Sequence, residues 1–242
     1  MSHVLIIPKE HPHSRLLEEV INSLLVIAPA EAVYVSRNGN NEDSPTFITF
    51  ILTDNCGQNS EGFQRLSEKI QLDYPHFIFR FFEDGEAANK FDEGNIYCIR
   101  HCNVNHLIYY QEGHNMFYPA FTKLKKKFRQ SKKHFNKRRD SHFETFAKAT
   151  SCLTDNKTVE AAAYLYKSFL RMYCFYLEVL VEDTLDDVDY VDFDEAYCRI
   201  TKAFPSLKKL LDLDNPQDRE MIDTLNTAHV CILQNQTMEQ VD

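Results

Sequence analysis

The sequence predicts an α+β protein in two parts, a small N-terminal mixed sheet with helices followed by a C-terminal bundle made only of helices. Short β-branched and aromatic runs alternate with amphipathic segments as far as Gly113, and no convincing strand follows. The segment Val159–Val181 lacks Gly and Pro and is apolar on nearly every side, which is typical of a helix packed on several sides. We therefore expect an α/β domain over residues 1–113 and a helical bundle over residues 114–242.

The N-terminal part should follow the order α-β-β-α-β-α-α-β. Leu17, Val20 and Leu24 recur at helical spacing, and Pro29 should stop this first helix. The run Thr46–Thr53 is β-branched and aromatic throughout, which favours a central strand joined by a long polar loop to the strand before it. The expected helices are His13–Ile27, Glu61–Leu72, Glu86–Phe91 and Asn95–Val104, and the expected strands are Ala32–Ser36, Thr46–Thr53, His76–Phe82 and His106–Tyr110.

The C-terminal part should hold a basic helix, the central helix and two shorter segments. The basic helix Pro119–Arg139 continues or restarts over Ser141–Leu153, whose inward residues should be Phe143, Phe146, Ala147, Ser151 and Cys152. Thr158 is the expected N-cap of the central helix. Its main apolar stripe should be Ala162, Leu165, Phe169, Tyr173, Tyr176, Leu177 and Leu180, with Tyr164, Leu170, Cys174 and Val181 beside it. The remaining expected helices are Phe193–Leu211, broken by Pro205, and Gln217–Gln234, with the apolar stripe Met221, Leu225, Ala228, Cys231 and Ile232.

Composition indicates an ordinary globular protein of 242 residues, 43% hydrophobic and 26% charged. Six glycines argue against glycine-rich phosphate loops. Seven scattered cysteines without a CxxC pair fit reduced, buried thiols. No segment has the length and apolar purity of a membrane span, and the N-terminus lacks the features of a signal peptide, so we expect a cytoplasmic protein with no membrane partner.

The net charge of −9 hides two concentrated charge runs. The segment Lys123–Arg139 holds ten Lys or Arg and no acid, whereas Glu182–Glu195 holds eight acids and no base. A clustered basic helix can bind phosphates, with Phe128 and Phe135 between the charges. It can equally be a solvated face that pairs with the acidic segment, within one subunit or across a dimer. The candidate nucleic-acid-binding residues are Lys125, Lys126, Lys127, Arg129, Lys132, Lys133, Lys137, Arg138 and Arg139.

Three segments carry a resemblance to a known family. They read AAAYLYKSFLRMYCFYLEVL at 161–180, TAHVCILQ at 227–234 and GNIYCIRHCNVNHLIYY at 94–110. With the order of the two parts, they resemble bacterial proteins that join a minimal nucleotidyltransferase domain to a HEPN domain. The resemblance implies a nucleotidyltransferase-like fold before the boundary, a HEPN-like bundle after it, and a homodimer formed through the helical part.

The catalytic signatures of both resembled domains are absent. The nucleotidyltransferase needs a Gly-Ser turn and two strand acids that hold divalent metals, but the turn here contains Ser36-Arg37, and Thr46 and Ile48 occupy the acid positions. Glu42 and Asp43 in the preceding loop could bind a metal, but acids in an Asn-rich turn are far more often solvated. The HEPN ribonuclease pairs an Arg with a His four to six residues later; Leu233 stands at the Arg position, with no His after it.

Two alternative sites remain open on the sequence. Arg129 and His134 have the spacing of a ribonuclease pair, although ten basic residues produce such a pair by chance. Cys98, His101, Cys102 and His106 are spaced i, i+3, i+4 and i+8, which on one helix places four zinc-type ligands along a single face. A packed helix end is the simpler interpretation, so no metal and no cofactor are predicted.

The favoured hypothesis is a non-catalytic binding or regulatory protein whose ligand is RNA, a nucleotide or a protein partner. The first alternative is an RNA-directed enzyme, either a ribonuclease or a nucleotidyltransferase with displaced residues. The second is a structural homo-oligomer held by its own opposite charges. Salt separates these hypotheses, because RNA binding should weaken steeply with salt, whereas the second alternative predicts dissociation of the oligomer without RNA affinity.

Overall fold

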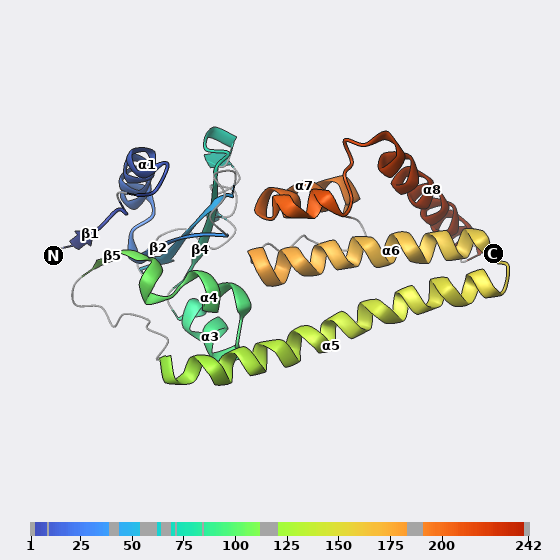
Figure 1. Ribbon diagram of the computed structural model, residues 1–242, viewed down its shortest axis with the longest axis horizontal. Coiled ribbons are helices and arrows are strands. Elements are labelled where there is room, and N and C mark those ends of the chain that lie inside the picture. The colour runs from blue at the N-terminus through green and yellow to red at the C-terminus, as the bar shows by residue number, and fades with distance from the viewer. Residues whose placement is uncertain are drawn as a thin grey trace. The chain divides into compact units, whose positions relative to one another are not determined.

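The computed structural model describes residues 3–8, 10–38, 44–53, 62–63, 69–70, 72–83, 85–111, 121–182 and 191–239. By its internal contacts the chain forms two compact units, which we call the sheet unit, Met1–Ser131, and the helical unit, Lys132–Asp242. The division falls inside a helix, later than the boundary at residue 113 expected from the sequence. The α+β class is confirmed, with the sheet before the long helix and helices after it (Figure 1).

Among its described residues, the sheet unit contains five strands in the order β1-β5-β2-β3-β4. All neighbouring pairs are antiparallel except β3 and β4, which are parallel. The strands are β1 (His3–Leu5), β2 (Ala30–Arg37), β3 (Thr46–Leu52), β4 (Phe77–Phe82) and β5 (Leu107–Gln111). Four of them confirm predicted strands to within two residues, and every residue of β3 is buried, as expected of a central strand. β1 was not predicted, because three residues at a sheet edge leave no periodic pattern.

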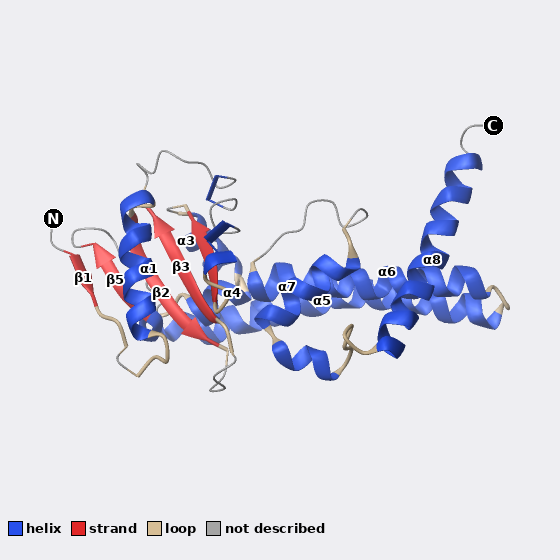
Figure 2. Cartoon of the chain, turned by 90° about the horizontal axis from the view of Figure 1, so that it is seen from above, coloured by secondary structure: helices blue, strands red, loops and turns tan. Residues whose placement is uncertain are grey.

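Helices cover both faces of this sheet. Helix α1 (Ser14–Ile27) lies across one face (Figure 2), where Leu17, Val20 and Ile21 join a core with Val33, Phe50 and Phe79. On the other face, α4 (Ile96–His101) brings Tyr97 against Phe47 and Phe82. The other helices of this unit are α3 (Glu86–Glu93) and the 3-10 turn η1 (Val104–His106). The predicted helix Glu61–Leu72 lies only partly within the described residues; of these, 62–63, 69–70 and 72–73 are helical.

The long helix α5 (Phe121–Thr154) joins the two predicted segments Pro119–Arg139 and Ser141–Leu153 into one. Its first turns pack on Gly94, which ends α3 with a positive φ of 85°. A Cβ on Gly94 would lie 3.3 Å from the backbone of Lys127 and of Ser131, so only glycine fits both the backbone conformation and the close approach. Lys127 also forms an ion pair with Asp92. These contacts assign the start of α5 to the sheet unit.

The helical unit contains α6 (Thr158–Tyr176), a π-helical turn η2 (Leu177–Val181), α7 (Phe193–Ala203), the 3-10 turn η3 (Pro205–Lys209) and α8 (Pro216–Glu239). The break at Pro205 is confirmed, whereas the N-cap of α6 is Lys157 rather than Thr158. Helix α6 packs on α7 and α8, with aromatic contacts from Tyr166 and Tyr173 to Phe193. Phe135 of α5 reaches Phe175 at a ring separation of 5.1 Å.

The expected inward faces of three helices were wrong in part. On α6 the fully buried stripe runs through Tyr166, Leu170 and Cys174, and the stripe expected to be the main one is mostly half-buried. In the second half of α5, the buried side chains among those described are Thr145 and Ala149. The residues expected inward there are exposed or half-buried: Phe143, Phe146, Ala147, Ser151 and Cys152. On α8 the buried positions are Ile222 and Leu225, whereas Met221 and Cys231 are exposed. Periodicity finds apolar stripes but cannot choose which of two adjacent stripes the neighbouring helices cover.

Candidate functional site

The two positions where the resembled nucleotidyltransferase has its acids lie in β3. Ile48 is fully buried in the core beneath α1, and Thr46 is 1% exposed. The Thr46 hydroxyl shares a hydrogen bond of 3.0 Å with Nε2 of His11. Neither side chain supplies the carboxylate that a divalent metal needs. Glu42 and Asp43, the displaced acids, lie outside the described residues.

Three histidines and Arg37 surround this end of the sheet on the α1 side. The His13 ring stacks on His76 at a centroid distance of 4.8 Å and an interplanar angle of 19°. Burial lowers the pKa of His11, and the positive charges of Arg37 and His13 lower it further. The pKa of His13 is lowered by burial and by the charges of His76 and Arg37. This end of the sheet therefore carries imidazoles and a guanidinium where metal-dependent phosphoryl transfer requires a pair of carboxylates.

The HEPN-type catalytic positions also lack the required groups. Leu233 is an exposed residue of α8. Arg129 of the alternative ribonuclease pair is exposed on α5, whereas the side chain of its partner His134 lies outside the described part of the chain. Ribonuclease chemistry at either place therefore receives no support from the described side chains.

A buried polar pair lies on the opposite face of the sheet, at the end of β2. The Oγ of Ser36 lies 2.6 Å from Nδ1 of His101, a contact across 65 positions of the chain. The His101 ring stacks on Phe47 at 4.5 Å and contacts Tyr97 at 4.6 Å, and its side chain is 2% exposed. Burial is the main cause that lowers the pKa of His101 to about 3, and the charges of Arg100 and His106 contribute. The imidazole is therefore neutral at pH 7.

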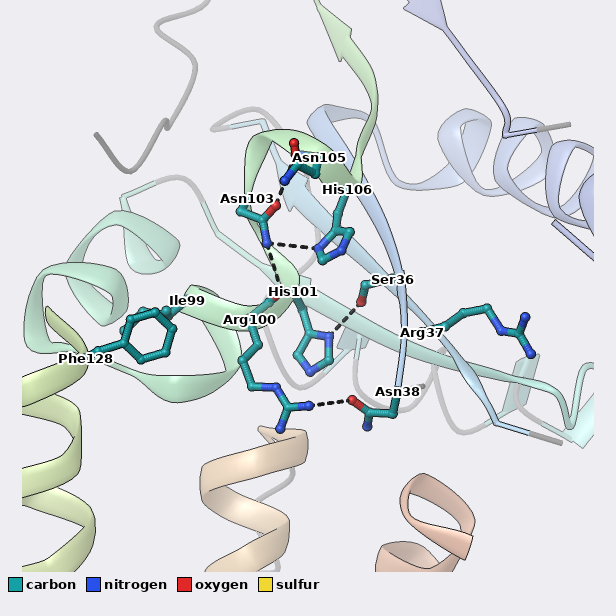
Figure 3. Close-up of a pocket in the computed structure, with 10 residues that line it drawn as sticks. All are labelled: Ser36, Arg37, Asn38, Ile99, Arg100, His101, Asn103, Asn105, His106 and Phe128. Atoms are coloured by element: carbon teal, nitrogen blue, oxygen red, sulfur yellow. Dashed lines mark hydrogen bonds between the residues drawn. The ribbon is translucent and has the colours of Figure 1, made fainter. Parts of the chain in front are cut away.

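A cavity of about 370 Å³ opens beside this pair (Figure 3). Nη2 of Arg100 donates to Oδ1 of Asn38 at 2.9 Å across the cavity wall. Nδ2 of Asn103 lies 3.0 Å from Nδ1 of His106. Phe128 and Ile99 line another side of the cavity (Figure 3). Nε2 of His101 and Nδ2 of Asn38 are buried nitrogens in the lining that have no hydrogen-bond partner. Buried unpaired donors are uncommon in folded proteins and therefore mark this cavity as a candidate binding site.

The structure separates the four candidate metal ligands. Helix α4 ends at His101, and η1 begins after Asn103, whose Oδ1 accepts from the backbone N–H of Asn105. This cap turns the chain, so His106 does not continue the helical face. Cys98 and Cys102 are fully buried, and Nδ1 of His101 is already paired with Ser36. Among the described residues, no three His, Cys, Asp or Glu side chains form a group that could hold a metal ion.

The candidate nucleic-acid-binding residues are all on α5. Lys126, Arg129, Lys132 and Lys133 are exposed, and no described acidic side chain pairs with them. We call these four residues the basic face. Two further candidates have acidic partners, since Lys127 pairs with Asp92 and Arg139 with Asp140. The side chains of the last three lie outside the described set: Lys125, Lys137 and Arg138. Residues 183–190 of the acidic segment also lie outside it.

Helical geometry explains why the basic face is solvated. With 100° per residue, its four members span about 120° of the helix circumference. Ser131 and Ala149, which are buried, lie on the opposite side of the same helix. The basic face therefore points away from the protein's own packing, and its charges are available to a ligand.

The pairing of Ser36 with His101 was not predicted from the sequence. The sequence pattern indicates a turn at Ser36 and a metal-type ligand spacing at His101, and neither pattern points to the other residue. The signal that could have suggested their pairing is a polar serine at the end of an otherwise apolar strand, because a buried hydroxyl needs a partner. The sequence does not indicate which of ten histidines supplies that partner.

Comparisons of the chain with protein-family models, with curated proteins and with solved structures find no match. In the part of the chain that the structure describes, no helix combines the length and apolar character needed to cross a membrane.

Proposed function

We propose that this protein is a non-catalytic RNA-binding protein of the nucleotidyltransferase-HEPN type that holds the RNA backbone with the basic face of α5. The observation that carries the proposal is the set of four exposed cations without described acidic partners. Clustered Lys and Arg release counterions from a phosphate backbone on binding, and this release supplies most sequence-independent affinity.

The residues at the expected catalytic positions support a binding role over an enzymatic one. Thr46 is hydrogen-bonded to His11, Ile48 is in the core, and Leu233 is an exposed apolar residue. None of these side chains can hold a metal or transfer a proton at neutral pH.

The test measures the binding of a fluorescently labelled single-stranded RNA by anisotropy at several salt concentrations. The variant replaces all four residues of the basic face by Gln. Because each phosphate contact contributes about 0.7 to the salt slope for single strands, losing four contacts should lower the slope by about 3. Affinity at low salt should fall by at least about tenfold, since each contact also contributes Coulomb attraction.

A matched control removes the same charge elsewhere, at the exposed residues Arg15, Lys148, Lys157 and Lys209, each changed to Gln. It should keep the wild-type salt slope. Equal losses in the two variants would mean that net charge alone drives binding, which contradicts the proposal. If the folded wild-type protein does not bind RNA, the proposal fails and a protein partner becomes the better account of the basic face.

A further inference from the structure

The cavity beside His101 is separate from the positions resembling a nucleotidyltransferase active site. Alternate residues of a strand point to opposite faces of the sheet. Ser36 and Phe47 therefore face α4 and the cavity, whereas Thr46 and Ile48 face α1. Nor does the cavity include any residue of the basic face.

His101 brings an unpaired N–H group to the cavity. The Ser36 hydroxyl is buried, and its one described partner is Nδ1 of His101, so the hydroxyl proton is satisfied when Oγ donates to Nδ1. A neutral imidazole that accepts at Nδ1 carries its own proton on Nε2. That Nε2 is buried and has no hydrogen-bond partner. An acceptor atom of a ligand would satisfy it.

Asn38 brings a second unpaired donor. Because Arg100 donates to Oδ1 of Asn38, the orientation of the amide is fixed with its nitrogen on the other side. Nδ2 of Asn38 is buried and has no partner. The Arg100 guanidinium is exposed and keeps further N–H groups, so three side chains offer donors at one place (Figure 3).

The charge of the lining selects an anion. The described residues around the cavity include no carboxylate, and the guanidinium of Arg100 lies beside the two unpaired donors, whereas the side chain of Arg37 points away from them (Figure 3). The positive charge of Arg100 is felt at His101, since it helps burial to lower the pKa of the imidazole. A phosphate monoester offers three acceptor oxygens to three donors, whereas a carboxylate offers two. Phe128, 49% exposed, and Ile99 give the cavity an apolar wall beside these donors.

We propose that this cavity binds a phosphate monoester carried by a planar apolar group, with His101, Asn38 and Arg100 donating to the phosphate oxygens and Phe128 contacting the planar group. Such a phosphate belongs to a small molecule or to the phosphorylated end of an RNA. The chemistry of recognition is the same for both.

The test measures phenyl phosphate binding by isothermal titration calorimetry, with benzoate and phenol as the comparison ligands. Phenyl phosphate should bind at least about tenfold more tightly than either, because it alone satisfies three donors. Arg100→Gln and Asn38→Ala should each weaken it by about tenfold, as loss of a charge-assisted or buried hydrogen bond does. Arg15→Gln, an exposed arginine on α1, is the control and should leave binding unchanged. Equal affinity for the three ligands would overturn the proposal.

His101 is tested by two substitutions. His101→Phe keeps an aromatic ring against Phe47 but removes the donor, and should abolish the preference for phenyl phosphate over phenol. His101→Gln retains an N–H donor and should restore part of that preference. If His101→Phe fails to fold, as circular dichroism would show, the two variants at Arg100 and Asn38 still decide the question.

The source of the phosphate is identified by competition. A 5′-phosphorylated RNA pentamer that displaces phenyl phosphate, when its unphosphorylated form does not, identifies an RNA end. Displacement by adenosine monophosphate but by neither RNA identifies a small molecule. Each measurement is repeated in the basic-face variant, where phenyl phosphate binding should persist. The cavity and the proposed RNA-binding face can therefore fail independently.

Discussion

The strand core of the sheet unit and the part of α5 that belongs to the helical unit cover their aromatic side chains to very different degrees. In the sheet unit, Phe47, Phe50, Phe63, Phe77 and Phe79 are all fully buried. In the helical unit, Phe143 is 58% and Phe146 is 50% exposed, and Leu153, Val159 and Tyr164 are exposed beside them in the sequence. Uncovered aromatic side chains gathered on one helix are typical of a surface that another chain covers.

This difference also separates two kinds of polar residue. The core of the sheet unit is closely packed and apolar. A buried donor without a hydrogen-bond partner, such as Nε2 of His101, therefore lowers the stability of the folded unit. The charged residues of the basic face of α5, two in each unit, are solvated, so their charges cost little free energy. We therefore expect substitutions in the sheet unit to act mainly on stability and those on the helical unit's exposed faces mainly on association.

The largest effect should come from Phe79→Ala in β4. Phe79 packs edge-on against Phe77 in the sheet core and is fully buried. Truncation of a buried Phe typically costs about 3–5 kcal/mol of unfolding free energy, through lost burial and the cavity left behind. Urea denaturation followed by circular dichroism measures this. The control Leu72→Ala, at an exposed position of the same unit, should change stability by less than about 0.5 kcal/mol. Similar losses of unfolding free energy in Phe79→Ala and Leu72→Ala would mean that the buried phenylalanines do not form the stabilising core of the sheet unit.

The strands show what could be predicted from the sequence. β3 was predicted as Thr46–Thr53 and runs from Thr46 to Leu52, because a strand buried on both faces is apolar without interruption. Helix positions were also largely predictable from spacing and from Pro29 and Pro205. These are local signals, and they do not depend on which part of the chain packs against which.

The candidate site depends on contacts that no local signal carries. Ser36 meets His101 across 65 positions, and Phe128 reaches the cavity from a third element. The metal-ligand spacing failed because Asn103 ends the helical path before His106, a capping effect of one side chain. The buried stripe of α6 was chosen wrongly because packing by α7 and α8 decides between adjacent apolar stripes.

The second effect is a loss of sheet-unit stability in acid. Burial holds the pKa of His101 near 3 in the folded protein, below the ordinary value of 6.5 that applies to the unfolded chain. As the pH falls below 6.5, His101 becomes protonated in the unfolded chain but stays neutral in the folded protein. The free energy of unfolding therefore decreases until the pH reaches about 3, where the folded protein is protonated as well. Between pH 7 and pH 5 this group alone should cost about 2 kcal/mol. His11 and His13, whose pKa values are also lowered, act in the same direction.

Urea denaturation at pH 7 and pH 5 measures this cost. His101→Gln, which does not titrate, should show a smaller loss between the two pH values than the wild type. Identical losses in the two proteins would mean that other groups account for the acid sensitivity, and would contradict the role assigned to buried His101.

The smallest effect on the free energy of unfolding should come from replacing Phe143 and Phe146, a change that should instead alter the oligomeric state. We propose that the exposed apolar residues of α5 pair with a second copy of the chain, because a surface with Phe143 and Phe146 uncovered is costly in water. The double substitution of these two residues by Glu should convert a dimer into a monomer, as measured by light scattering at micromolar concentration. Because both side chains are exposed, unfolding of the monomer should change by less than about 1 kcal/mol.

A matched control separates this interface from general surface hydrophobicity. Val26→Glu places the same charge at an exposed apolar position of α1, on the sheet unit. It should leave the dimer intact, because we expect association to involve only the unit whose aromatic residues are uncovered. Dissociation by Val26→Glu as well, or a wild-type protein that is already a monomer, would mean that the uncovered aromatic residues do not mark a self-association surface.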